Sequence, residues 1–387
     1  MDIENMISSK VKSIKPSLIR KFLNLAPKVP GAISLTIGQP DFNTPENIKE
    51  AGINAIKSNH TTYTHNQGYI EFRREISDHM KRLYGLEYDP EDEIMATAGS
   101  GQAIDISIRT LIEDGDEVLI PSPGYPAYEA CTTMAGGKPV LVPVYMEDGF
   151  KLKAHNLEKY ITPRTKVLIL SYPCNPTGAT MDKDDLYEIS KSVIKNNLIV
   201  ISDEVYSQMT YGKRHVSIAS LDGMKDRTVL INGFSKAYSM TGWRLGYVAA
   251  PKDIIDYIVK AHQFSVTCAP SISQCAGIEA LLHGDEGVGR MVEEYDRRRL
   301  YCFERISKMS LPCFKPTGAF YLFPDIEKYG MSSNEFCTKL LFDGKLAVVP
   351  GLAFGKFGEG HIRISYAYSM ETLKEGLNRL ESFLHTL

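Results

Sequence analysis

Seven short apolar runs, separated by amphipathic stretches, constrain the fold of this chain more than any other feature. They are residues 93–97, 116–121, 139–144, 166–171, 198–203, 228–232 and 247–250. Several of these runs are apolar throughout, which is typical of strands that are buried on both faces of a parallel sheet. Helical patterns lie between them, at 101–112, 184–195 and 252–262. The alternation predicts an α/β fold in which a mostly parallel, seven-stranded sheet lies between helices.

The rest of the chain has a different pattern of apolar and charged residues, which predicts a second, smaller domain of the α+β class. Residues 271–310 are helical in pattern and rich in charge. Three short strand-like runs and a closing helix follow, at 319–323, 346–350, 360–366 and 371–384. With 387 residues, the chain is long enough for two domains. We expect residues 46–285 to form the large domain, and residues 1–45 and 286–387 to form the small one.

Composition disfavours several classes of partner and site. A net charge of −3 gives no reason to expect nucleic acid or an anionic membrane as a partner. The apolar runs are far shorter than the ~20 residues that span a bilayer, and residues 1–5 lack the features of a signal peptide. The seven cysteines include no Cys-x-x-Cys pair and the nine histidines no His-Glu-x-x-His, so no disulfide framework or metal site is indicated. We therefore expect a reduced, cytoplasmic protein.

Residues 235–246 carry the strongest chemical signal. Lys236 lies among small and apolar residues, eight positions before Arg244. A lysine in such surroundings is costly to keep charged, so it can become a neutral amine that forms a Schiff base with a carbonyl. The alternative is an ordinary surface lysine near a helix end. Residues at the ends of the other predicted strands favour the nucleophile.

Ligands of an open α/β sheet bind beyond the carboxyl ends of its strands, and polar residues follow five of the predicted strands here. Gly99, Ser100 and Gly101 would present backbone N–H groups at a helix amino terminus, which suits a phosphate, although any tight connection could use them. The residues at the other strand ends are Tyr125, Asn175, Asp203, Tyr206 and Lys236. Tyr125 could instead be a core tyrosine and Asp203 a helix cap. A carboxylate on so apolar a strand nevertheless requires a cationic or hydrogen-bonding partner.

Together these groups are what a pyridoxal phosphate site requires. Asp203 would keep the pyridinium nitrogen protonated, so that the ring acts as an electron sink. Tyr125 would stack on the ring, and Asn175 and Tyr206 would donate hydrogen bonds to its 3-oxygen. The phosphate group would be bound by charge-assisted hydrogen bonds from Arg244 and by its neighbours Gly99, Ser100, Gly101 and Ser235.

Several further motifs cover nearly the whole chain in a fixed order. They are Gly38-Gln39-Pro40-Asp41, Tyr63-Thr64 with Gly68, Asn175-Pro176-Thr177-Gly178, Asp203-x-x-Tyr206, Ser235-Lys236, Gly242-Trp243-Arg244-x-Gly246 and His361-Ile362-Arg363-Ile364-Ser365. In these motifs the chain resembles the class I and II, fold-type I pyridoxal phosphate-dependent aminotransferases.

The resemblance implies the fold, the partners and the roles of the site residues. It implies a homodimer in which Tyr63 reaches the phosphate site of the neighbouring subunit. Gly38, Asn175 and Arg363 would bind the substrate, with Arg363 clamping its α-carboxylate as a bidentate pair. An amino acid would displace Lys236 from the cofactor, and the freed amine would move the α-proton as general base and acid. The reaction would be a ping-pong exchange of an amino group between an L-amino acid and a 2-oxo acid, with glutamate and 2-oxoglutarate as one pair.

The second substrate is indicated by finer resemblances. Gly101 stands where members specialised for aspartate often carry a lysine, which weakens a strict dicarboxylate interpretation. Residues 34–42 and 271–274 are most similar to bacterial members that use N-acetyl-LL-2,6-diaminopimelate in lysine biosynthesis, and aromatic aminotransferases are nearly as similar. A carbon–sulfur β-lyase or a racemase could use the same fold and lysine. A nucleotide-binding enzyme is disfavoured, because residues 351–357 fall one residue short of a P-loop.

Overall fold

The structure of the protein is a computed structural model that describes residues 3–387. Met1 and Asp2 lie outside the described residues, so the amino-terminal stretch in which we expected no signal peptide is only partly described. Within residues 3–387, no helix is both long enough and apolar enough to cross a lipid bilayer.

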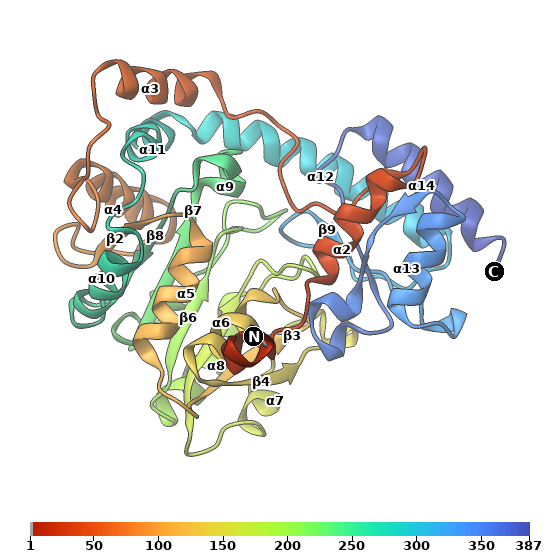
Figure 1. The fold of residues 1–387 in the computed structure, drawn as a ribbon, viewed down its shortest axis with the longest axis horizontal. Coiled ribbons are helices and arrows are strands. Elements are labelled where there is room, and N and C mark those ends of the chain that lie inside the picture. Colours follow the sequence, from red (N-terminus) through yellow and green to blue (C-terminus); the bar gives the residue numbers. More distant parts are fainter. Residues whose placement is uncertain (1–2) are drawn as a thin grey trace.

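A seven-stranded sheet forms the centre of the larger part of the molecule (Figure 1). Its strands are β2 (Ile94–Thr97), β3 (Glu117–Ser122), β4 (Lys138–Pro143), β5 (Thr165–Ser171), β6 (Ile199–Asp203), β7 (Thr228–Gly233) and β8 (Gly246–Ala249), in the order β2-β8-β7-β6-β5-β3-β4. Neighbouring strands are parallel except around β8, which is antiparallel to both β2 and β7. The predicted α/β fold with a mostly parallel sheet is therefore confirmed, and every strand begins and ends within one residue of its predicted bounds.

The central strands are apolar throughout because helices cover both faces of the sheet. In β5, Val167 and Ile169 pack in a core with helices α5 (Ser100–Leu111) and α10 (Lys252–Val266), while Leu168 and Leu170 pack against α8 (Lys183–Lys195). Successive side chains of a strand point to opposite faces, so each face of β5 supplies alternate residues to a different core. These three helices correspond to the three predicted in this region.

Other helices of the described chain were not predicted. They are α1 (Ser9–Lys12), α2 (Leu18–Leu25), α3 (Glu46–Lys57), α4 (Ile70–Tyr84), α6 (Ala127–Ala135), α7 (Ala154–Glu158), α9 (Phe234–Ala237) and α13 (Ser333–Phe342). In α4 the buried stripe is narrow: Phe72, Ile76 and Met80 are buried at intervals of four residues on an otherwise charge-rich helix. A buried stripe this narrow can be recognised only when the elements that pack against the helix are known.

The smaller part of the molecule contains two further sheets and a set of helices. Its elements are β1 (Ile33–Ser34), α12 (Asp285–Lys308), β9 (Tyr321–Leu322), α13 (Ser333–Phe342), β10 (Leu346–Ala347), β11 (Val349–Pro350), β12 (Ile362–Ser365) and α14 (Met370–Leu384). The helical pattern predicted over 271–310 is confirmed as α11 (Ser271–His283) followed by α12. The single strand predicted over 346–350 is wrong. Its first half pairs with β1 and its second half with β12, because the chain changes sheets at Val348.

Helix α12 and the segment before α3 join the two parts. In Figure 1 α12 runs from α11, above the large sheet, to the part that holds α13 and α14. The amino-terminal segment passes in the opposite direction, from α2 through β1 to α3. The segment between β1 and α3 contacts both the larger part and α12, because Gly38 accepts a hydrogen bond from Lys236 and Asp41 accepts one from Arg298 of α12.

Candidate active site

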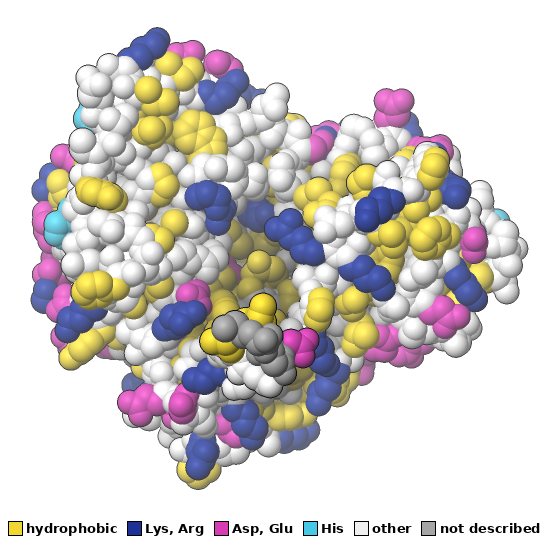
Figure 2. Space-filling view, in the orientation of Figure 1, with side chains coloured by type: hydrophobic (Ala, Val, Ile, Leu, Met, Phe, Trp, Pro, Cys, Tyr) yellow, Lys and Arg dark blue, Asp and Glu magenta, His cyan; other side chains and the backbone are white. Residues whose placement is uncertain are grey.

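The surface is hollowed between the two parts of the molecule, with hydrophobic side chains in its depth and lysine and arginine side chains around its rim (Figure 2). Three strands of the large sheet carry predicted site residues at or after their carboxyl ends. Asp203 ends β6, Lys236 lies in the short helix α9 (Phe234–Ala237) that follows β7, and Asn175 lies in the loop after β5. Arg363 comes from β12 of the smaller part. Because parallel strands end at one edge of the sheet, residues far apart in the sequence meet there.

Lys236 lies in surroundings that disfavour its charged form. Its Nζ donates a hydrogen bond to the carbonyl oxygen of Gly38 at 2.5 Å and lies 5.7 Å from the centre of the Tyr206 ring. Burial lowers the pKa of Lys236 to about 8, and the positive charges of Arg363 and Arg244 act in the same direction. At neutral pH a larger share of this side chain is therefore a neutral amine than in a solvated lysine.

Asp203 is buried and is held by two hydrogen bonds rather than by an ion pair. The Tyr128 hydroxyl donates to its Oδ2 at 2.7 Å, and the backbone N–H of Val205 donates to its Oδ1 at 3.2 Å. Burial raises the pKa of Asp203, and these hydrogen bonds oppose that effect. The partner that such a carboxylate requires is thus a tyrosine of α6, which the sequence analysis missed. The available signal was only local, a second tyrosine three residues after Tyr125.

The amino terminus of α5 forms a cup with Arg244. Gly99 precedes the helix with φ of +83°, and a methyl group on it would lie 2.5 Å from the Arg244 Nη2. That nitrogen is 3.4 Å from the carbonyl oxygen of Ala98, whereas a methyl group on Gly101 would meet nothing within 4 Å. The free N–H groups of the helix and the guanidinium therefore border the same open space, which suits a dianion such as a phosphate. Ser235, in α9, is buried.

Arg363 is a buried cation that no carboxylate neutralises among residues 3–387. It is 2% exposed; its Nη1 donates to Asn175 Oδ1 at 2.8 Å and its Nη2 to the Thr36 carbonyl oxygen at 2.5 Å. Within the described chain its Nε has no hydrogen-bond partner. Burial lowers the pKa of Arg363. A guanidinium buried with a free N–H and no carboxylate partner suits an anionic ligand.

The predicted tyrosines behave in three different ways. Tyr125 is 37% exposed and lies edge-on to Tyr128, with ring centres 5.6 Å apart, so it is not a core residue. Tyr206 is buried, and its hydroxyl is 2.7 Å from the hydroxyl of Tyr321, a neighbour that the sequence analysis did not identify. Tyr63 is 83% exposed, and the structure does not bring it to the other predicted site residues of the same chain.

Trp243 serves packing. Its indole N–H donates to the Thr44 hydroxyl at 3.2 Å, and its ring lies so close to α3 that a methyl group on Gly52 would be 2.6 Å from it. The tryptophan thereby fixes the loop that carries Arg244 against α3.

The residues brought together fit a ligand that has a phosphate, a ring nitrogen and a carbonyl group. The cup beside Gly99 offers N–H groups and a guanidinium to the phosphate. The buried Asp203 is a hydrogen-bond acceptor for a protonated ring nitrogen, and the amine of Lys236 can attack a carbonyl. Pyridoxal phosphate has these three groups.

Comparisons with known proteins identify relatives over nearly the whole chain. A model of the family "Aminotransferase class I and II" matches residues 30–380. The chain is 47% identical to a probable N-acetyl-LL-diaminopimelate aminotransferase of Bacillus subtilis, over 99% of this chain and 96% of that protein. It is 46% identical to an aspartate aminotransferase of Pyrococcus abyssi, over 98% of each. Among solved structures, an aromatic aminotransferase from Pyrococcus horikoshii is similar with a TM-score of 0.91 and 47% identity, over 95% of this chain and 99% of that one.

Proposed function

This chain belongs to the class I and II aminotransferase family, and on that premise we propose that it binds pyridoxal 5′-phosphate at Lys236 and uses Lys236 as its acid–base catalyst. Aminotransferases of this family act on amino acids and 2-oxo acids and depend on pyridoxal phosphate. The observation that carries the proposal is the lysine itself: an amine with its pKa lowered to about 8, which follows β7, the strand that pairs with β6 and its buried terminal carboxylate Asp203.

Three groups of this chain would hold the cofactor. Arg244, Ser235 and the α5 amino terminus at Gly99, Ser100 and Gly101 would bind the phosphate. Asp203 would hold a proton at the ring nitrogen, while Tyr125, Asn175 and Tyr206 would contact the ring and its 3-oxygen. Bound pyridoxal phosphate supplies an electron sink that stabilises negative charge at the substrate α-carbon.

Lys236 would take the α-proton of the substrate and deliver it to the carbon that was the carbonyl carbon of the cofactor. A lysine with an ordinary pKa is almost fully protonated at pH 7 and is therefore a poor base. The lowered pKa of Lys236 makes its neutral form accessible and its proton transfer efficient in both directions. The Gly38 carbonyl, which accepts a hydrogen bond from Nζ, keeps the amine beside the site.

Arg363 would bind the α-carboxylate of the substrate. Two of its nitrogens are engaged by Asn175 and Thr36, which orients the guanidinium plane, and its Nε is left without a partner within the described chain. A bidentate pair with a carboxylate would satisfy this buried charge. The same contact would place the substrate α-carbon near Lys236, because Arg363 and Lys236 donate to backbone carbonyl oxygens only two residues apart, those of Thr36 and Gly38.

The second subunit of a homodimer would complete the site. Family members are commonly dimeric, and Tyr63 and Phe264 are 83% and 88% exposed in one chain. Large aromatic side chains at such exposure favour an interface. We propose that Tyr63 reaches the phosphate group of the other subunit, and that residues 46–285 form the cofactor-binding domain.

The proposed physiological pair is N-acetyl-LL-2,6-diaminopimelate with glutamate and 2-oxoglutarate, a step of lysine biosynthesis. The relative from Bacillus subtilis, named as a probable aminotransferase of this substrate, supports it at 47% identity. Aromatic amino acids are the second candidate, because the Pyrococcus horikoshii structure is titled an aromatic aminotransferase and has the same identity. Gly101 stands where members specialised for aspartate often carry a lysine. This difference supports both candidate substrates over an enzyme restricted to dicarboxylic amino acids.

A panel of amino donors tests substrate and reaction together. Purified protein is supplied with 2-oxoglutarate and, in turn, acylated diaminopimelate, phenylalanine, tyrosine or aspartate, and glutamate formation is measured. The highest kcat/KM with the acylated donor is expected. A higher value with an aromatic donor would instead select the second candidate. Pyruvate and ammonia from cysteine-type donors, without glutamate formation, would identify a β-lyase.

Lys236→Ala tests the proposed catalyst. Removal of both nucleophile and base should lower kcat by about 10⁴-fold or more. Lys308→Ala is the matched control, because Lys308 is exposed on α12 and pairs with Glu304 on the same helix. Turnover by Lys236→Ala at the rate of the control would refute the assignment.

A further inference from the structure

Residues 36–44, which we call the crossing segment, connect β1 to α3 and contact both cations of the site. The carbonyl oxygen of Thr36 accepts a hydrogen bond from Arg363, and that of Gly38 accepts one from Lys236. Between them, the N–H of Ile37 donates to the Tyr368 hydroxyl at 3.1 Å. A shift of the crossing segment would therefore change the surroundings of both groups, Arg363, which would bind the carboxylate, and Lys236, which would transfer the proton.

Gly38 lies in close contact with side chains of the site. A methyl group at this position would be 2.0 Å from the hydroxyl oxygen of Tyr321, which is itself 2.7 Å from the hydroxyl of Tyr206. The backbone at Gly38 thus has no room to move inward, and its position depends on what holds the segment from the outside.

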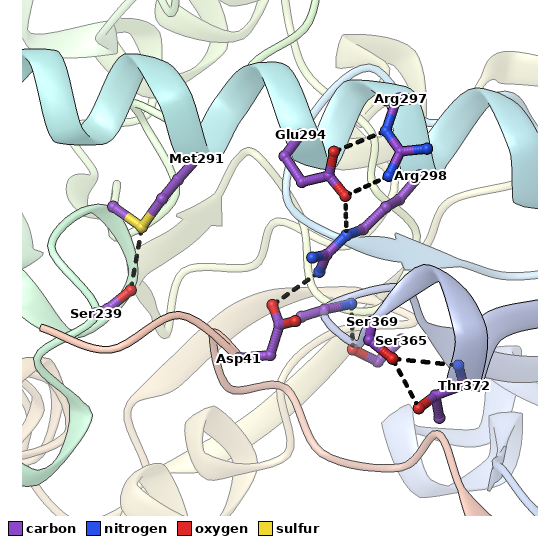
Figure 3. Close-up of polar contacts among 10 residues, drawn as sticks. Asp41, Ser239, Met291, Glu294, Arg297, Arg298, Ser365, Ser369 and Thr372 are labelled. Carbon is purple, nitrogen blue, oxygen red and sulfur yellow. Dashed lines mark hydrogen bonds and ion pairs between the residues drawn. The ribbon is translucent and has the colours of Figure 1, made fainter.

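Arg298 is the charged group that holds the segment from the outside (Figure 3). It projects from α12, is only 5% exposed, and donates from Nη1 to Asp41 Oδ1 at 2.7 Å and from Nε to Glu294 Oε1 at 2.8 Å. The Arg298–Asp41 bond is the one ion pair of the crossing segment among the described residues.

Two aromatic rings extend this attachment. The Arg298 guanidinium carbon lies 5.2 Å from the centre of the Phe42 ring and 5.6 Å from that of Tyr295, and these two rings meet edge-on at 5.4 Å. Phe42 belongs to the crossing segment and Tyr295 to α12. One buried arginine therefore links the segment to the helix through both charge and ring contacts.

Arg297, the residue before Arg298 on α12, provides an internal comparison. Arg297 also donates to Glu294, at 2.7 and 2.8 Å, but its side chain is 58% exposed and it does not reach Asp41 (Figure 3). The two arginines share a carboxylate partner and an element and differ in whether they contact the crossing segment. An effect on the site that is specific to Arg298 would therefore act through its contacts with Asp41, Phe42 and Tyr295, and a substitution of Asp41 separates the first contact from the other two.

We propose that Arg298 is a positioning residue for substrate binding, which holds Gly38 and Thr36 against the two cations through its ion pair with Asp41. This proposal rests on the proposed roles of Lys236 and Arg363. A segment that is held in place before the substrate arrives does not have to be ordered by it, so the binding free energy is not reduced by that cost. Loss of Arg298 should then raise KM more than it lowers kcat, the pattern expected when ground-state and transition-state binding weaken together.

The test compares Arg298→Met with Arg297→Met in the cofactor-loaded enzyme. For Arg298→Met, KM for the amino donor should rise by about tenfold or more, because small misplacements of binding groups have large effects on rate and binding. Its kcat should stay within about threefold, and Arg298→Lys should recover part of the loss by keeping the charge. Arg297→Met should keep both parameters. Equal effects of the two variants, or an unchanged KM in Arg298→Met, would overturn the proposal.

Asp41→Asn keeps the test decisive if Arg298→Met does not fold. This substitution retains the shape of the side chain at a position that is partly exposed, and it should raise KM in the same direction. Where both single variants fold, the double variant Asp41→Asn with Arg298→Met should have a KM no higher than that of Arg298→Met alone. Both substitutions remove the same ion pair, so the second has nothing further to remove. Additive effects would show that the two residues act separately and would contradict the proposal.

Hydrogen exchange supplies a readout that needs no turnover. In protein free of cofactor, amides of the crossing segment should exchange faster in Arg298→Met than in Arg297→Met, while those of β6 stay unchanged. If wild-type enzyme and Arg297→Met transfer amino groups, the proposed function stands whatever Arg298→Met does. Absence of amino transfer by the wild type would refute the proposed function and leave the exchange experiment as the test of Arg298. Equal exchange in the two variants would refute the positioning role.

Discussion

Tyr128→Phe is the substitution by which the structure can be tested most directly, because it removes one oxygen from a buried pair. The Tyr128 hydroxyl donates to Asp203 at 2.7 Å, and both side chains are at most 4% exposed. A hydrogen bond to a charged group contributes about 1.5–3 kcal/mol, and no water is expected to replace it in so buried a place. Its loss would raise the pKa of Asp203 further, since this bond is the largest of the effects that oppose burial.

The expected consequence is a weaker partner for the ring nitrogen of the cofactor. If the full 1.5–3 kcal/mol is lost from the transition state, kcat falls by about 10- to 100-fold. The acid limb of the kcat–pH profile should move to higher pH, because the carboxylate with a raised pKa is protonated at a higher pH. Steady-state kinetics across pH, with a parallel measurement of the cofactor dissociation constant, provides the assay.

Tyr125→Phe is the matched control for this measurement. Tyr125 lies 5.6 Å from Tyr128, ring centre to ring centre, and also loses only a hydroxyl, but it makes no hydrogen bond to Asp203 among the described contacts. Its kcat–pH profile should keep the wild-type acid limb. A Tyr128→Phe enzyme with wild-type kcat and an unmoved acid limb would refute the argument that Tyr128 sets the charge state of Asp203.

Other predictions follow from the cup, the lysine and the sheet core. Gly99→Ala should weaken cofactor binding, measured by equilibrium titration, because its methyl group would lie 2.5 Å from Arg244 Nη2 on a backbone with positive φ; an unchanged dissociation constant would argue against the cup. The pKa of Lys236, lowered to about 8, lies below its value in the unfolded chain, so the unfolded state binds more protons in this window. The contribution of Lys236 to stability should therefore grow as pH rises from about 8 to 10, and it is measured as the difference in unfolding free energy in urea between cofactor-free wild type and Lys236→Met. Burial raises the pKa of thiols such as Cys131 and Cys302, which acts in the opposite direction, but this effect is common to both proteins and cancels in the difference. Ile201→Ala in β6, fully buried, should cost about 2–5 kcal/mol in the same assay, whereas Ile194→Ala, 44% exposed, should cost far less.

The strands of the large sheet could be predicted because their signal is local. Val167 to Leu170 are apolar in sequence since both faces of β5 are buried, and each residue carries that information itself. The run 346–350 looks the same in sequence, but Leu346 and Val349 belong to different sheets. Apolar character predicts burial, and it does not specify which strand a residue pairs with.

The residues of the candidate site also fall into two classes, those with a local signal in the sequence and those recognised only through a long-range contact. Lys236 and Asp203 could be identified because a cation or carboxylate beside apolar residues is unusual wherever it occurs. Tyr128 was missed because its importance comes from a contact across 75 positions of the chain. Tyr321 was missed for the same reason, with 115 positions between it and Tyr206.

The sequence by itself determined the α/β fold, the seven strands and the chemical identity of the lysine and carboxylate, because these depend on residue types and their local spacing. Only the tertiary structure decided what surrounds them. Gly38 meets Lys236 across 198 positions, and Arg298 meets Asp41 across 257. These contacts exist because the sheet, α12 and the crossing segment converge at one place. The pKa of a group depends on such neighbours and on burial, so the reactivity of the lysine depends on the fold as well as on the residue.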